Sequence, residues 1–73
     1  MYAEKIQILE YEISEIKKAI KASKKEIKKR EKILSMVVDN DIEVEIDMYK
    51  EDIESFENQL KTKKELLKNY KKL

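Results

Sequence analysis

Apolar residues recur along the first half of the chain at alternating spacings of three and four. This spacing is the heptad repeat of helices that pack along one narrow stripe, with the seven positions lettered a to g. Position a of this half holds Ile6, Ile13, Ile20, Ile27 and Leu34, and position d holds Tyr2, Leu9, Ile16, Ser23, Arg30 and Val37. The repeat predicts a helix over residues 2–38.

A second heptad run occupies the other half of the chain. Its a positions are Ile46, Ile53, Leu60 and Leu67, and its d positions are Ile42, Tyr49, Phe56, Lys63 and Tyr70. The two runs are out of phase, because continuing the first repeat would place Asp41 and Glu51 in the packed stripe. The phase change favours two separate helices over one continuous rod, and it predicts a second helix over residues 41–72.

Local chemistry places the break at residues 39–41. Asp39, Asn40 and Asp41 have short polar side chains that bond to nearby backbone and favour turns. Asn40 followed by Glu43 three residues later resembles a capping box that would start the second helix. We therefore expect residues 1–73 to form a single all-α domain, an antiparallel two-helix hairpin of the coiled-coil type.

The distribution of charge indicates the same orientation. Residues 1–15 sum to −3, residues 16–34 to +7, residues 35–60 to −8 and residues 61–73 to +5. Folding the chain back at the break places each block beside one of opposite sign, whereas a parallel pairing of identical chains would place like charges together. The charge blocks therefore favour an antiparallel hairpin.

Two registers between the helices remain open at this stage. In one, the numbers of facing residues sum to about 83, which places Lys24 near Glu57; in the other they sum to about 76 and more of the N-terminal apolar residues are used. In either register Arg30 and Lys63 fall at d positions. We expect their apolar stems to be covered and their charges to stay in water.

Positions c and g form a contiguous face beside position d, which we call the flank. They carry 7 charged residues out of 20, whereas positions b, e and f carry 22 out of 30. An apolar face outside the packed stripe is typical of a protein interface, and we expect a homodimer that forms a four-helix bundle. The other two interpretations are a foreign protein partner on the same face and a mere widening of the stripe within the hairpin. The predicted interface residues are Ile8, Ala19, Ala22, Ile33, Met36, Met48, Leu66 and Leu73.

Composition excludes most chemistry. The chain has no His and no Cys, so the commonest general base, the thiol nucleophile and the best transition-metal ligands are missing. We expect no enzyme, no catalytic residue, no cofactor, no metal and no small-molecule substrate. The longest apolar run is Met36-Val37-Val38, too short for a membrane span or a signal peptide, which predicts a cytoplasmic protein with no membrane partner.

A row of lysines on the outer face of the first helix is the main candidate for nucleic-acid contact. It comprises Lys17, Lys21, Lys24, Lys25, Lys28 and Lys32. Such a row can neutralise backbone phosphates, but no aromatic residue interleaves with it to stack on bases. A solvated face that complements the acidic second helix is the favoured explanation of the row.

These observations lead to three functional hypotheses. The first is a non-enzymatic protein–protein interaction module, a small regulator or inhibitor that docks on a host protein. Ten Ile and sixteen Lys suit an AT-rich genome, which suggests a phage or mobile element and a location in the host cytoplasm. The alternatives are a nucleic-acid-binding hairpin dimer that uses the row from Lys17 to Lys32, and a purely structural coiled-coil assembly module.

Overall fold

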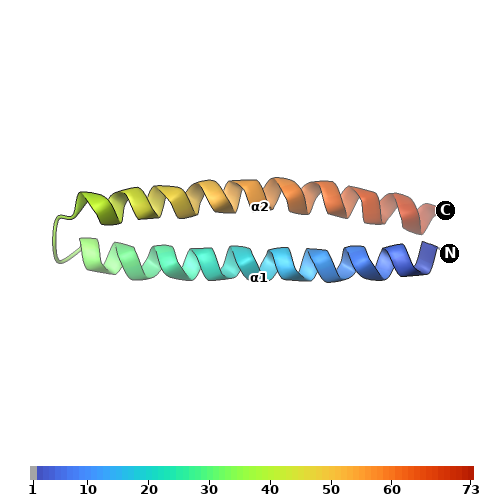
Figure 1. Cartoon of the computed structure of the whole chain (residues 1–73), viewed down its shortest axis with the longest axis horizontal. Helices are drawn as coiled ribbons and strands as arrows, with labels where there is room; N and C mark the ends of the chain where they lie inside the picture. The colour runs from blue at the N-terminus through green and yellow to red at the C-terminus, as the bar shows by residue number, and fades with distance from the viewer. Residues whose placement is uncertain (1) are drawn as a thin grey trace.

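The computed structural model describes residues 2–73 as two long helices that lie side by side and run in opposite directions (Figure 1). Helix α1 spans Tyr2–Leu34 and helix α2 spans Asn40–Lys72, each 33 residues long. The hairpin measures 55 × 14 × 13 Å, and the start of α1 and the end of α2 both lie at the end opposite the turn (Figure 1). The predicted all-helical hairpin is confirmed, and the described part of the chain contains no strand.

The core is a single narrow seam between the two helices. Leu9, Ile13 and Ile16 of α1 are 8% exposed and Ile46 of α2 is 5% exposed, while Ser23 is buried among them. In α2, the buried and half-buried residues are the predicted a and d positions, namely Ile42, Ile46, Tyr49, Ile53, Phe56, Leu60, Lys63, Leu67 and Tyr70. Two helices can cover only one stripe of each other, so no side chain in residues 2–73 is fully enclosed. A core this thin supplies only about 3–5 kcal/mol of net stability.

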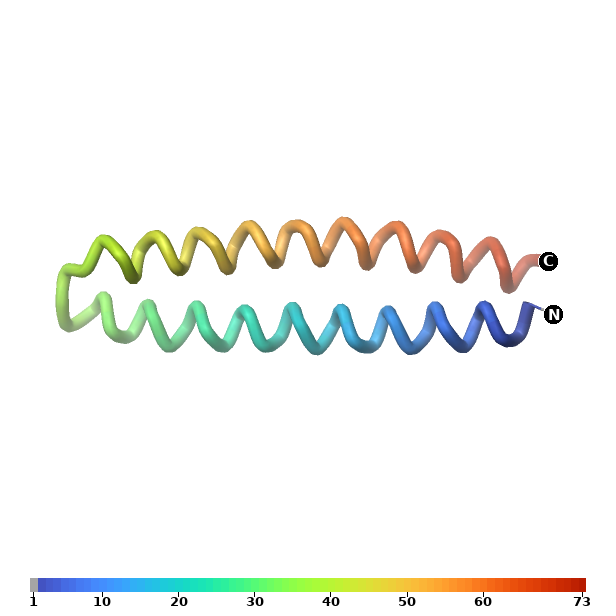
Figure 2. The backbone as a smooth tube through the Cα atoms, viewed as in Figure 1, coloured from blue at the N-terminus to red at the C-terminus, as the bar shows by residue number. Residues whose placement is uncertain are grey.

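Helix α1 ends at Leu34, four residues earlier than the predicted end at residue 38. The connection occupies residues 35–39 rather than 39–41, because the chain must cross from one helix to the other before α2 begins (Figure 2). The carbonyl of Ile33 accepts hydrogen bonds from the backbone N–H groups of Met36 and Val37, both at 3.0 Å. These bonds satisfy a carbonyl at the helix end that has no partner within the helix.

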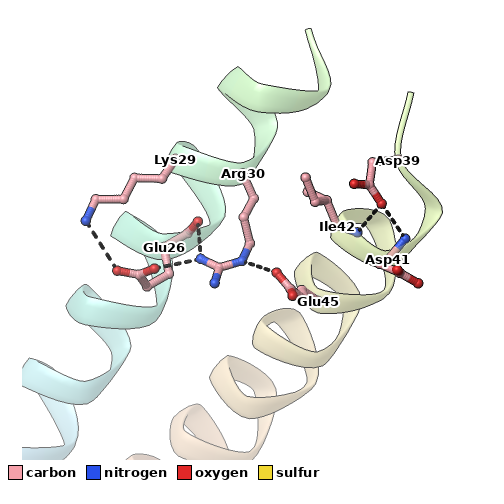
Figure 3. A network of polar contacts seen from close by, with 7 residues as sticks. All are labelled: Glu26, Lys29, Arg30, Asp39, Asp41, Ile42 and Glu45. Carbon is pink, nitrogen blue, oxygen red and sulfur yellow. Dashed lines mark hydrogen bonds and ion pairs between the residues drawn. The ribbon is translucent and has the colours of Figure 1, made fainter. Parts of the chain in front are cut away.

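Asp39, and not Asn40, caps the start of α2. One carboxylate oxygen of Asp39 accepts hydrogen bonds from the backbone N–H of Asp41 at 2.9 Å and of Ile42 at 3.4 Å (Figure 3). Asn40 is already the first helical residue, so the expected pairing of Asn40 with Glu43 is replaced by this cap. A carboxylate at the helix start combines hydrogen bonding with attraction to the positive end of the helix dipole, which explains the preference.

Two ion pairs between the helices establish the register. The Lys63 ammonium donates a hydrogen bond to Glu12, and the Arg30 Nε donates one to Glu45 at 2.7 Å. In both pairs the residue numbers sum to 75, close to the second of the two expected registers. The basic half of α1 thus lies beside the acidic half of α2, as the charge blocks predict.

Candidate interaction surfaces

The hairpin leaves the flank uncovered. Seven of the eight predicted interface residues are exposed, and only Ala19 is half-buried. The most exposed of the large side chains in this set on the helices are Met48 at 59% and Ile8 at 50%. The flank therefore adds little to the seam, and apart from Ala19 the predicted interface residues stay exposed within residues 2–73.

Large apolar side chains lie toward the two ends of the flank, and smaller side chains lie in its middle. Ile8 and Leu66 lie toward the chain termini, and Ile33 and Met48 lie toward the turn. In its middle the flank carries small or neutral residues, namely Ala19 and Ala22 on α1 and Ser55, Gln59 and Thr62 on α2, and the charged flank residues Glu12, Glu15, Glu26, Lys29 and Asp52 lie around them. The flank has bulky apolar ends and a low middle over which another helix can approach closely.

Three exposed apolar residues form the tip of the hairpin. Met36, predicted to lie on the helical flank, is instead in the connection, together with Val37 and Val38. Val38 is 93% exposed. Sequence reasoning placed these residues in the first helix, and the only signal that they belong to the turn is the β-branched pair itself, which lowers helix propensity.

Arg30 is the centre of a polar network at one edge of the flank (Figure 3). Its guanidinium donates to Glu45 of α2 at 2.7 Å and to Glu26 of α1 at 2.6 Å, and it lies 4.7 Å from the centre of the Tyr49 ring. Hydrogen bonds to Glu45 and then to Glu26 raise the pKa of Arg30, and the hydrogen bond from Arg30, helped by Lys29, lowers the pKa of Glu26. The network holds the two helices together near the turn.

Lys63 is the counterpart of Arg30 near the other end. Its side chain is 30% exposed and that of Glu12, its partner, is 39% exposed. Both cations thus occupy d positions, with covered stems and paired heads, and both reach a glutamate at a g position of the opposite helix. The expectation that Arg30 and Lys63 extend from the seam toward water is confirmed. The ion pairs add that these charges lie at the flank.

The lysine row borders a shallow groove on the opposite side of the seam. Its volume is about 530 Å³, it has an apolar floor, and its lining residues include Lys17, Lys18, Lys21 and Lys64. A second depression of about 220 Å³ continues from Lys21 along α1 and is lined by Lys21, Lys24, Lys25 and Lys28. Lys64 of α2 joins this surface only after folding, so the sequence alone gave no reason to include it. Lys32 is also exposed on α1.

The described residues contain no group of side chains suited to hold a metal ion, and no helix among them is long and apolar enough to cross a membrane. The surface features of the hairpin are therefore the flank, the apolar tip and the basic groove. Comparison of the chain with protein family models, with curated proteins and with solved structures finds no match.

Proposed function

We propose that this chain is a non-enzymatic protein-interaction module whose binding surface is the flank and whose partner there is a second copy of the chain. The observation that carries the proposal is the exposure of Ile8, Ile33, Met48 and Leu66 on one face of a hairpin with a thin core. Burying such side chains provides the main favourable energy in most protein association.

The size of the flank supports a second copy as the occupant. A face of the hairpin measures 55 by 14 Å, or about 770 Å². Stable interfaces of ordinary size bury about 800 Å² per partner. One hairpin laid along another therefore offers a flat footprint comparable with the area that a stable interface buries on each partner, and the product is a four-helix bundle.

Charge complementarity supports the same occupant. The flank carries one interhelical ion pair toward each end, Glu12 with Lys63 and Arg30 with Glu45, and each pair contributes one positive and one negative group. A second copy brings the same two pairs, so Glu12 of one copy can face Arg30 of the other. In such a bundle the outer arcs of both helices stay free for a host protein, as a small regulator or inhibitor requires.

Light scattering tests the proposal directly. The expected mass is twice the monomer mass of 8.8 kDa. Ile33→Lys and Leu66→Lys should shift the chain to monomer, while Tyr11→Lys and Val44→Lys, which change exposed apolar residues off the flank, should not. A folded monomer at all concentrations would overturn the proposal and direct attention to a foreign partner.

The basic groove supports a second candidate function, the binding of nucleic acid. Folding adds Lys64 to the lysine row, and Lys17 and Lys21 line the same groove. We expect Lys21→Gln with Lys64→Gln to weaken binding to duplex DNA or RNA and to reduce the salt slope by about two, since two phosphate contacts are lost. Lys68→Gln with Lys72→Gln removes the same charge elsewhere. Equal effects of the two double substitutions, or no mobility shift at all, would exclude the groove as a nucleic-acid-binding site.

A further inference from the structure

The flank has nearly the same pattern read from either end. On α1, Ile8 and Ile33 lie equally far on either side of the midpoint between Ala19 and Ala22. A helix that packs antiparallel against its own copy needs such a palindrome, because each residue meets the one at equal distance beyond the two-fold axis. The α1 flank therefore matches itself in the antiparallel direction.

Helix α2 shows a similar palindrome with other residues. Met48 and Leu66 lie equally far from the midpoint between Ser55 and Gln59. The interhelical ion pairs place this midpoint within about one helical turn, ~5.4 Å, of the midpoint on α1. A two-fold axis placed between the two midpoints therefore serves both helices with an offset of about 4 Å between facing residues, less than one helical turn.

We infer that two copies pack flank to flank and end for end, with their turns at opposite ends of the bundle. This inference rests on the proposed function, since it specifies how the second copy is seated. Helix α1 then meets α1 of the second copy, with Ile8 of each against Ile33 of the other and the alanines at the axis. Helix α2 meets α2 of the second copy. Met48 of each copy then lies against Leu66 of the other, on either side of the low middle.

Charge along the flank is compatible with this seating. Glu12 faces Lys29 and Arg30 of the second copy, because these residues lie almost equally far from the axis. The one like-charge contact is Glu15 against Glu26. Each of those carboxylates is already paired within its own helix, Glu15 with Lys18 at 3.3 Å and Glu26 with Arg30 at 2.6 Å.

The alternative seating, with both turns at the same end, is less favourable. It places α1 against α2 of the second copy. Residues at the same height then face each other, so Ile33 lies opposite Asp41 and Ala22 lies opposite Asp52. Each contact would take a carboxylate out of water against an apolar side chain, with no cation facing it. Among the large apolar residues, only Ile8 and Leu66 would gain an apolar contact, at the end of the hairpin near the chain termini.

Disulfide cross-linking distinguishes the two seatings, because the natural chain has no Cys. Chains with Ile8→Cys are mixed with chains that carry either Ile33→Cys or Leu66→Cys, allowed to exchange and then oxidised. End-for-end packing predicts at least about ten-fold more cross-linked dimer with Ile33→Cys, since a disulfide needs Cα atoms within about 7 Å. Tyr11→Cys with Val44→Cys, both off the flank, serves as the control pair.

Each outcome has one meaning. Preferential linking of Ile8→Cys to Leu66→Cys would overturn the end-for-end seating and leave the dimer intact. No linking of either pair, with light scattering still reporting a dimer for the reduced chains, would place the contact off the flank and overturn both the seating and the flank as the binding surface. Ile8→Cys alone should not link to itself, because in the inferred bundle these residues lie about 37 Å apart along the axis. A monomer mass would instead refute the proposed function.

Discussion

Replacing Ile46 by Ala should remove most of the stability of the isolated hairpin. Ile46 is 5% exposed and is the most deeply buried apolar residue of α2. The substitution deletes three side-chain carbons at about 0.8 kcal/mol each and leaves a cavity in a seam that cannot close over it, for a total loss of about 3 kcal/mol. The whole hairpin has only about 3–5 kcal/mol. The variant should therefore lie close to its unfolding midpoint in buffer alone.

Val44→Ala provides a matched control on the same turn of α2. Val44 is 57% exposed at an outward position, so its truncation should change stability by less than about 0.5 kcal/mol. Urea denaturation followed by circular dichroism measures both variants. The titrations are run at two protein concentrations, because assembly raises apparent stability by mass action. Equal losses for Ile46→Ala and Val44→Ala would refute the placement of Ile46 in the seam.

Three further predictions concern the cap and the ion pairs. Asp39→Ala should cost about 1 kcal/mol in urea denaturation by removing the cap of α2, and Asp39→Asn should retain most of it. Because Arg30 lowers the pKa of Glu26 below 4.5 in the folded chain, ionised Glu26 stabilises the fold above that pH and the benefit is lost on acidification. As the pH falls from about 5 to 3, thermal melts should therefore show a smaller fall in melting temperature for Glu26→Gln than for the natural chain. Equal falls for the two chains would contradict this. Glu12→Lys and Lys63→Glu should each destabilise by about 0.2–1 kcal/mol and the double swap should restore the loss; additive effects would show that the pair is not coupled.

The residues of the seam could be predicted from the sequence because burial in a two-helix hairpin follows the heptad repeat. Each a and d position from Ile42 to Tyr70 is buried or half-buried, including Lys63, whose charge gave no other reason to place it there. The end of α1 was not predictable in the same way. The heptad pattern continues to Val37, but a helix can use a d position only where another helix lies opposite it, and α2 begins at Asn40. Tertiary geometry, and not local propensity, ends α1 at Leu34.

The register and the basic groove could not be predicted from the sequence, for a related reason. Both registers place opposite charges near one another, so the charge blocks alone could not separate them. The structure separates them through side chains that the sequence places in the seam: Arg30 and Lys63 reach Glu45 and Glu12. Likewise Lys64 is one lysine among several until folding brings it beside Lys17.

The positions of these ion pairs change the meaning of the charge pattern. As blocks, the charges specify that α1 and α2 run antiparallel within one chain. As individual residues, Glu12 and Arg30 lie at nearly equal distances from the midpoint of the α1 flank, where they can also align a second chain. A flank of apolar residues alone would allow a partner hairpin to slide by one turn at little cost, whereas ion pairs that meet only at one level penalise the shifted arrangements. The two ion pairs therefore fix the register within the hairpin, and Glu12 and Arg30 of these pairs also fix the register between hairpins in the proposed bundle.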